Sequence, residues 1–220
     1  MKQKCIIVGG GDFFYDETPF NEKKDFIIAC DSGLNYLIEK KIVPDLIIGD
    51  FDSLGYVPDN AVVLPAEKDV TDIKAAVDYA LEKGFTDFEI YGGLGGERLS
   101  HTIANIQNLI FLINFFAEKN LDTEAKKSCN CTLYGDKIAI TAMGKGEKYY
   151  ENFAFKNKYI SVFAYTESAV VSLSGLKYEL KEFTLSNSVP LGVSNEFDFV
   201  NSKSAKITVH SGIVLIVFEF

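Results

Sequence analysis

The sequence is poor in histidine and has no tryptophan. Its 220 residues include only two histidines, His101 and His210. Histidine is the side chain whose unperturbed pKa lies nearest to neutral pH, and it is also the commonest metal ligand. An enzyme built around a histidine base or a histidine-rich metal centre is therefore not favoured.

The four cysteines do not have the spacing of a common metal site. Cys5 and Cys30 lie in apolar, strand-like runs, which predicts small buried side chains. Cys129 and Cys131 are separated by one residue, whereas common zinc sites have a gap of two, and no histidine lies near them in the sequence. Free thiols are typical of a reducing compartment.

Long hydrophobic runs are lacking as well. No window is long enough to span a bilayer, and the start M-K-Q-K-C-I-I-V lacks the long apolar region of a signal peptide, so we expect a cytoplasmic protein. Acidic residues outnumber basic ones by 31 to 22, which gives a net charge of −9. This charge argues against nucleic acid and membranes as partners, although a local basic pocket for a small anion is allowed.

Short apolar runs alternate with helical hydrophobic periods in the first half of the chain. Each run is too short for a helix and rich in β-branched residues. This alternation predicts right-handed βαβ units, so we expect an α/β domain with a parallel, Rossmann-like sheet over residues 1–123. The predicted strands are Lys4–Val8, Phe26–Cys30, Leu46–Ile48 and Phe88–Tyr91.

The hydrophobic period changes after the polar segment 121–127. The following residues form short strand-like runs that are separated by glycine, asparagine and serine. This pattern is typical of an all-β sandwich, which we expect over residues 124–220. The predicted strands are Cys131–Tyr134, Lys137–Ala142, Tyr159–Ala164, Ala169–Leu173, Ala205–His210 and Ile213–Phe218.

Aspartates follow the predicted parallel strands. Asp50 and Asp52 come directly after Gly49, and in an extended backbone they would share one face about 6–7 Å apart. Two carboxylates at that distance repel each other, which suggests a cation between them. Asp31 follows the preceding strand, and Asp72 opens the next helix, where Asp69 or Thr71 is the expected N-cap.

A glycine-rich loop precedes the longest predicted helix, which runs from about Arg98 to Lys119. The loop contains Gly92, Gly93, Gly95 and Gly96, and Arg98, His101 and Asn105 would share one polar side of the helix. Glycines, an arginine and a helix N-terminus together favour an anion site. The expected apolar face of this helix consists of Leu99, Ile103, Ile106, Ile110 and Ile113.

Carboxylates and an anion site at the same sheet edge predict a Mg²⁺–polyphosphate site. Mg²⁺ typically takes one or two carboxylates and completes its shell with waters and substrate phosphates. Phosphoryl-type transfer needs mainly alignment and charge neutralisation, so it does not require a histidine or a nucleophilic serine. Ser194 and Asn195 lie in an unpatterned stretch near 187–202 and suit either a polar heterocycle or a simple turn.

The sequence resembles the thiamine pyrophosphokinase family over both expected domains. An ordered set of motifs, rather than any single motif, gives this resemblance. In the α/β part the motifs are Asp31-Ser32-Gly33, Pro44-Asp45, Gly49-Asp50-Phe51-Asp52-Ser53, Lys68-Asp69-Val70-Thr71-Asp72 and the segment from Gly93 to Asn105. In the β part they are Gly175-Leu176-Lys177-Tyr178, Gly192-Val193-Ser194-Asn195-Glu196-Phe197 and Gly212-Ile213-Val214-Leu215.

The resemblance implies that the chain transfers pyrophosphate from ATP to the hydroxyl of thiamine, giving thiamine diphosphate and AMP. It also implies Mg²⁺ and a homodimer whose sites join the α/β domain of one subunit to the β domain of the other. The implied catalytic residues are Asp50, Asp52, Asp72 and Arg98, and the first three are the implied metal ligands. The implied substrate contacts are Asp31, Lys68, Asp69, Thr71, Gly95, Gly96, Ser100, His101 and Asn105 for the nucleotide side, and Ser194 and Asn195 for thiamine.

Two positions depart from the family pattern G-G-R-x-D-H. Glu97 replaces a glycine, and Ser100 replaces an acidic residue near the substrate. These departures leave open a thiamine or nucleotide sensor without activity. The strand-end D-x-D also occurs in phosphatases with an aspartyl nucleophile and in metal-dependent glycosyltransferases, although the phosphatases usually carry it on the first strand.

Overall fold

The structure is a computed structural model that describes residues 4–13, 20–67, 69–96, 98–119, 129–151, 159–198 and 204–220. The chain divides into two compact units, Met1–Asp136 and Lys137–Phe220. The expected domain boundary at 123/124 lies outside the described residues. Within the described ranges, no helix is long and apolar enough to cross a membrane.

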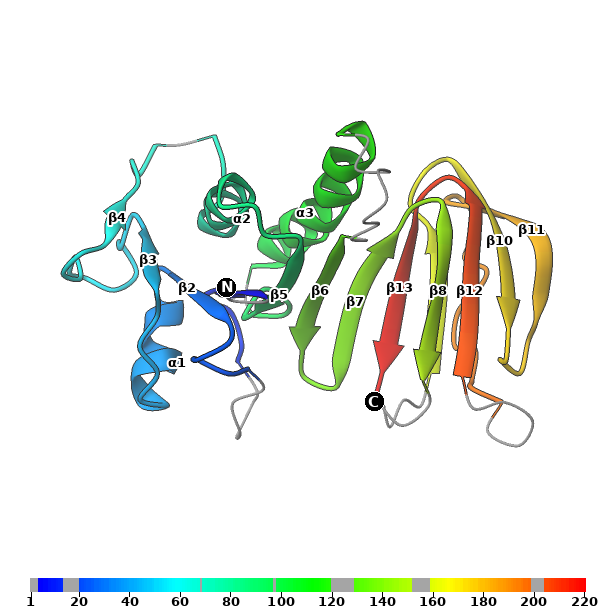
Figure 1. Cartoon of the computed structure of the whole chain (residues 1–220), viewed down its shortest axis with the longest axis horizontal. Coiled ribbons are helices and arrows are strands. Elements are labelled where there is room, and N and C mark those ends of the chain that lie inside the picture. The colour runs from blue at the N-terminus through cyan, green and yellow to red at the C-terminus, as the bar shows by residue number, and fades with distance from the viewer. Residues whose placement is uncertain are drawn as a thin grey trace. The chain divides into compact units, whose positions relative to one another are not determined.

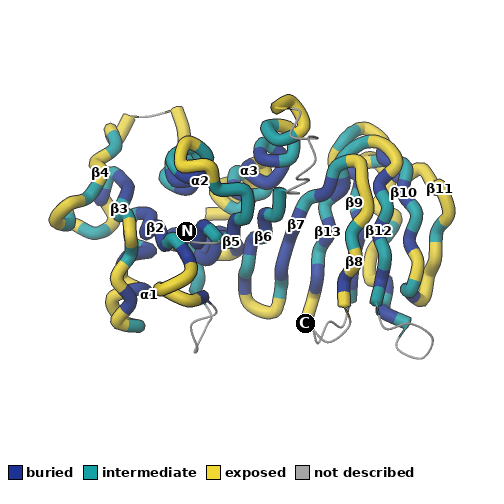
Figure 2. The backbone as a smooth tube through the Cα atoms, in the orientation of Figure 1, coloured by how far each residue is buried: buried dark blue, intermediate teal, exposed yellow. Residues whose placement is uncertain are grey.

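The first unit contains a parallel sheet with the strand order β4-β3-β2-β1-β5-β6 (Figure 1). Every strand pair in this order is parallel, which agrees with the predicted βαβ pattern. The central strands are buried on both faces (Figure 2), as their continuous apolar sequences require. The strands are β1 (Cys5–Val8), β2 (Phe26–Cys30), β3 (Leu46–Gly49), β4 (Val62–Val63), β5 (Asp87–Tyr91) and β6 (Asn130–Gly135).

Helices cover both faces of this sheet. Helix α1 (Gly33–Glu39) lies on one face, and helices α2 (Asp72–Glu82) and α3 (Leu99–Glu118) lie on the other (Figure 1). Leu34 and Leu37 of α1 pack with strand residues that include Ile6 and Val8. The alternate residues of the strands therefore face different helices, and the carboxyl ends of the strands stay open between them.

The strand 131–134 was expected in the β-sandwich, and this expectation is wrong. Residues Asp87–Tyr91 of β5 pair with Asn130–Tyr134 of β6 in parallel register. The sequence of β6 alternates buried and partly buried residues, a pattern that also suits an antiparallel strand. Only its pairing with β5 places it in the parallel sheet.

The expected apolar face of α3 is also partly wrong. Leu99 and Ile103 are 69% and 52% exposed, whereas Asn105 and Asn108 are only 3% and 4% exposed. The buried positions are spaced by three and four residues, as expected for one helix face, but this face is rotated toward the asparagines. The rotation places Asn105 against the glycine loop, where its Nδ2 donates to the carbonyl of Gly93 at 2.9 Å.

The second unit contains two antiparallel groups of strands. One has the order β7-β13-β9 and the other β11-β10-β12-β8. Tyr150 of β8 and Phe218 of β13 pack ring against ring across them, with centroids 5.1 Å apart. This part is sandwich-like, as predicted. The strands are β7 (Ile138–Met143), β8 (Gly146–Glu151), β9 (Tyr159–Ala164), β10 (Ser168–Ser174), β11 (Leu180–Ser186), β12 (Ser204–Ser211) and β13 (Val214–Glu219).

Candidate functional site

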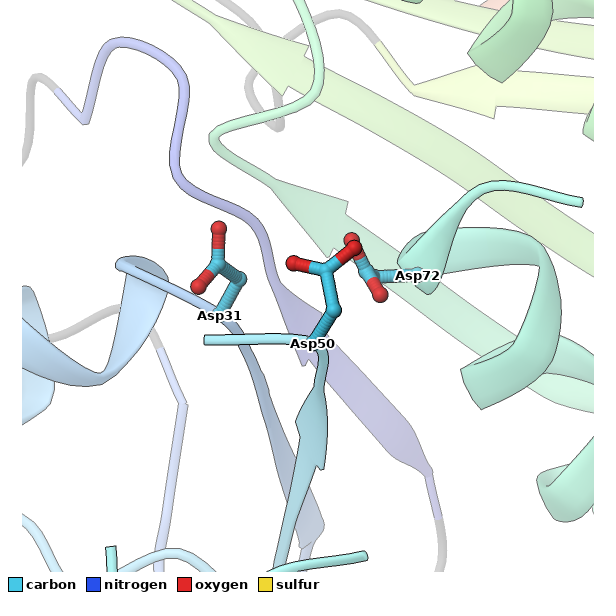
Figure 3. Close-up of side chains that lie close together, drawn as sticks. All are labelled: Asp31, Asp50 and Asp72. Carbon is cyan, nitrogen blue, oxygen red and sulfur yellow. The ribbon is translucent and has the colours of Figure 1, made fainter. Parts of the chain in front are cut away.

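Three aspartates converge at the carboxyl edge of the parallel sheet. Asp31 follows β2, Asp50 follows β3, and Asp72 is the first residue of α2 (Figure 3). Each offers a carboxylate oxygen, and these oxygens all lie within 4.8 Å of one another. Because parallel strands bring their ends to one edge, residues far apart in the sequence meet here.

The pair Asp50 and Asp52 does not have the expected extended geometry. The residue between them, Phe51, is buried and has a φ of +60°, which is rare for a bulky side chain. Strand β3 has already ended at Gly49, so the rule that residues i and i+2 point the same way does not apply. Asp31 therefore takes the place beside Asp50 and Asp72 that was expected for Asp52, which is exposed but still lines the same cavity.

The Asp31 carboxyl is in an environment that disfavours its charge. Burial, together with the nearby carboxylates of Asp72 and Asp52, raises the pKa of Asp31, and a hydrogen bond from Ser53 to Oδ2 opposes this shift. The other oxygen, Oδ1, is buried and accepts no hydrogen bond from any described residue. A divalent cation would offset the repulsion and bind such oxygens, so this donor set fits Mg²⁺.

A cavity of about 760 Å³ opens over the three aspartates. It brings together most of the predicted nucleotide-side residues, whereas Ser100 does not line it and Lys68 lies outside the described residues. The predicted residues that line the cavity are Asp31, Asp50, Asp52, Asp69, Thr71, Asp72, Gly95, Gly96, Arg98, His101 and Asn105.

The two glycine loops of the cavity pack against each other. The N–H groups of Gly9 and Gly11 donate to the carbonyls of Tyr91 and Gly92 at 2.8 and 2.9 Å. A Cβ on Gly92 would lie 2.2 Å from the carbonyl oxygen of Gly9, so no larger residue fits there. These glycines thus permit the close approach of two backbone segments. The N–H groups of Gly9 and Gly11 already donate within the protein, so they are not available to a ligand in this conformation.

Three side chains hold the second glycine loop in place. Asp12 accepts a hydrogen bond from Gly96 N–H at 2.8 Å, and Thr102 Oγ1 accepts one from Gly95 N–H at 3.2 Å. Asn105 adds the bond to Gly93 already described. We did not predict Asp12 or Thr102. Asp12 could have been found by the rule that singled out Asp31 and Asp50, because it follows the glycines at the end of β1.

The N-terminus of α3 supplies the positive side of the cavity. Arg98 is the N-cap residue, and both it and His101 are exposed and line the cavity. The helix dipole favours an anion at this end, although the His101 N–H already donates to the carbonyl of Arg98 at 3.0 Å. Arg98 is the only cationic side chain among the described residues that line the cavity.

Thr71 has a structural contact within the cavity wall. It is the N-cap of α2, and its Oγ1 accepts a hydrogen bond from Lys74 N–H at 3.2 Å. The alternative N-cap, Asp69, is exposed and also lines the cavity. The cap fixes the start of α2 and so the position of Asp72.

The predicted thiamine contacts lie in the second unit. The segment Gly192–Asn195 runs beside β9, where Asn195 forms an antiparallel bridge with Ile160. Asn195 is buried and Ser194 is exposed. Ser194 is therefore accessible to a ligand, whereas Asn195 is largely shielded from one.

Two family models match the chain. The catalytic domain of thiamin pyrophosphokinase matches residues 18–120, and the vitamin B1 binding domain of thiamin pyrophosphokinase matches residues 146–214. The first match contains the acidic cluster, and the second contains Ser194 and Asn195.

Relatives match nearly the whole chain. A thiamine pyrophosphokinase from Bacillus subtilis is 31% identical over 207 residues, which cover 89% of this chain and 90% of the relative. The crystal structure of thiamine pyrophosphokinase from Bacillus subtilis superposes with a TM-score of 0.80 at 27% identity and covers 98% of both chains. A thiamin pyrophosphokinase structure from Candida albicans, at 16% identity, shares the fold with a TM-score of 0.75 and covers 100% of this chain and 90% of that chain. The chain belongs to the thiamine pyrophosphokinase family.

Proposed function

We propose that the protein transfers pyrophosphate from ATP to the hydroxyl of thiamine, with Mg²⁺, and forms thiamine diphosphate and AMP. The acidic cluster of Asp31, Asp50 and Asp72 is the observation that carries this proposal. Carboxylates repel a bare polyphosphate, and they bind one well only when a cation lies between them. The match to both family domains supports thiamine as the acceptor.

The chain would meet the charge of the nucleotide from two sides. Asp31, Asp50 and Asp72 would hold Mg²⁺, and Asp52, which lines the same cavity, is retained from the family pattern as a further ligand. When bound, Mg²⁺ neutralises phosphate charge that would otherwise oppose attack by the hydroxyl.

Arg98 and the N-terminus of α3 would supply the positive charge. They would bind phosphate oxygens and stabilise the charge that develops on the departing AMP. The N–H groups of Gly95 and Gly96 already donate to Thr102 and Asp12. The glycine loop therefore contributes mainly shape and close approach to this site. The geometry suits positioning and charge neutralisation, as phosphoryl-type transfer requires.

The test is an assay of the purified chain with MgATP and thiamine that measures AMP and thiamine diphosphate. Both products should appear in equal amounts. Asp50→Asn should lower turnover at saturating MgATP by about 100-fold or more, because it removes one charge from the cation site. Asp59→Asn is the matched control, since Asp59 is exposed in the β3–β4 connection and does not line the cavity.

Other results of this assay would favour other functions. Binding of thiamine without release of AMP would indicate a sensor. Hydrolysis of simple phosphate esters would indicate a D-x-D phosphatase. Near-full turnover of Asp50→Asn would contradict the role of the acidic cluster.

We also propose a homodimer with sites composed of residues from both copies, as the family resemblance implies. Two variants that are each inactive, Asp50→Asn and one altered near Ser194, should regain up to about a quarter of the activity when their subunits are mixed, because random pairing restores one intact site in half of the dimers. Each variant alone is the control. No recovery after verified subunit exchange would contradict composite sites.

A further inference from the structure

The segment Gly192–Asn195 is fastened to the edge of β9 that β13 does not occupy. Val162 N–H donates to the carbonyl of Gly192 at 2.9 Å, and Asn195 and Ile160 exchange both backbone hydrogen bonds at 3.0 and 2.8 Å. A Cβ on Gly192 would lie 2.3 Å from the carbonyl oxygen of Val162, so the close approach requires glycine. The segment therefore covers an edge that would otherwise expose unpaired backbone groups.

Ser194 interrupts this regular pairing. Its φ of +54° lies in the left-handed region, which is sterically unfavourable for a residue with a side chain. In this conformation the Ser194 N–H donates to the side chain of Ser161, at 2.9 Å from Oγ. Ser161 lies on β9 and is buried. A buried hydroxyl on the neighbouring strand thus accepts the hydrogen bond that a backbone carbonyl would accept in a regular ladder.

The side chain of Asn195 is committed to the protein. Its Oδ1 accepts hydrogen bonds from the N–H groups of Tyr178 and Glu196 at 3.0 and 2.9 Å, and its Nδ2 donates to the carbonyl of Tyr178 at 2.8 Å. Asn195 is only 6% exposed. These contacts tie the segment to the turn around Tyr178, and they leave Asn195 with little capacity to bind a ligand directly.

The exposed part of the segment is uncharged. Leu191 and Val193 are 48% and 52% exposed, and the exposed Ser194 has a hydroxyl with no hydrogen-bond partner among the described residues. The nearby Glu196 is paired with Lys177 at 3.0 Å, so its charge is balanced. Apolar side chains beside one hydroxyl suit a neutral face of a heterocyclic ring and do not suit a phosphate group.

We propose that Ser161 is a positioning residue for the alcohol substrate, because its buried hydroxyl holds Ser194 in the left-handed conformation that presents the Ser194 hydroxyl beside Val193. Asn195 holds the same segment through its hydrogen bonds to Tyr178 and Glu196. It is therefore also a positioning residue, and it does not contact the substrate itself. This inference rests on the proposed function for the identity of the substrate. The claim that Ser161 holds Ser194 in place does not depend on the substrate.

The test compares Ser161→Ala with the unaltered protein in thiamine binding and in amide hydrogen exchange. Loss of the acceptor should weaken thiamine binding about three- to tenfold, the range expected for one hydrogen bond, while the KM for MgATP and kcat change less than about twofold. Exchange of the Ser194 amide hydrogen should become about tenfold faster or more. Ser161→Thr keeps the hydroxyl and should restore both properties.

Ser172→Ala is the matched control. The Ser172 Oγ also accepts a backbone N–H, from Glu182 at 2.9 Å, but it lies in the other strand group of the second unit. This variant should leave thiamine binding unchanged, so a general loss of stability is separated from loss of positioning. Unchanged thiamine binding in Ser161→Ala would overturn the positioning role even if the Ser194 amide exchanged faster. If the unaltered protein bound no thiamine, the proposed function would fail first, and the exchange data alone would then show whether Ser161 holds Ser194.

Discussion

The acidic cavity and the segment on β9 satisfy their polar groups in opposite ways. In the cavity, three carboxylates lie together, and Asp31 keeps a buried oxygen that accepts no hydrogen bond from any described residue. On β9 and in the segment beside it, the side chains of Ser161 and Asn195 form hydrogen bonds with Ser194, Tyr178 and Glu196. The first region gathers like charges that a cation would offset, whereas the second is hydrogen-bonded within the protein and offers a preformed surface. A nucleotide could bring this cation with it as its Mg²⁺ complex, whereas a surface that is already ordered binds a ring without the entropy cost of ordering the protein.

The largest effect is expected for Asp31→Asn. Turnover should fall by about 100-fold or more, because the cation site loses a charge. The melting temperature in the presence of a chelator should rise by about 2–4 °C, since one like-charge repulsion is removed and asparagine tolerates the φ of +48° at this position. Thermal unfolding and the AMP assay measure the two effects. A lower melting temperature of this variant in the presence of the chelator would contradict the inference that charge repulsion destabilises the cluster.

Asn195→Ala should have the opposite effect on stability. It leaves the N–H and carbonyl of Tyr178 and the N–H of Glu196 without their partner, which should lower the free energy of unfolding by about 2–3 kcal/mol. Denaturant unfolding measures this change. Ser194→Ala, which keeps the backbone N–H that donates to Ser161, is the control and should be nearly neutral. Equal stability of both variants would show that Asn195 is not structural.

Asp12→Ala tests the order of the glycine loop, because the Asp12 carboxylate holds the Gly96 N–H. The hydrogen bond to Gly96 N–H would be lost, and the loop before α3 would become less ordered. We expect the KM for MgATP to rise about tenfold, the value of one charge-assisted hydrogen bond. Asp12→Asn keeps an acceptor oxygen, so its KM for MgATP should lie between those of the unaltered protein and Asp12→Ala. Tighter MgATP binding in both variants would instead mean that Asp12 competes with phosphate for this N–H.

The smallest expected effect is that of Thr71→Ala. The N-cap hydrogen bond to Lys74 N–H is lost, which should lower stability by about 1 kcal/mol and the melting temperature by about 2–4 °C. Thr71→Ser keeps the cap and is the control. If Thr71 also binds nucleotide, the turnover of Thr71→Ala will fall by more than its loss of about 1 kcal/mol in stability explains.

The elements of the fold were more predictable than their pairing. The strands Phe26–Cys30 and Tyr159–Ala164 have the predicted bounds, and Thr71 is one of the two predicted N-caps. Strands β8 and β11 were not predicted, because their exposed, charged residues give little hydrophobic alternation. The parallel pairing of β6 could not be predicted either, since an alternating strand fits a parallel pair as well as a sandwich.

The same holds for the candidate site. The motif Gly49-Asp50-Phe51-Asp52-Ser53 and its companions identify the family and the sheet edge, because strand ends in a βαβ pattern meet there. Which carboxylates meet is a property of the backbone: the left-handed Phe51 breaks the two-residue period, and Asp31 joins Asp50 and Asp72.

The sequence by itself determined the strand–helix order, the acidic chemistry and the family, because these depend on residue type and spacing along the chain. The tertiary structure decided the membership of the carboxylate cluster, the rotation of α3 that buries Asn105, and the structural role of Asn195. These features depend on which groups from distant segments satisfy one another. A hydrogen-bond partner such as Ser161, 33 residues from Ser194, has no local signal in the sequence.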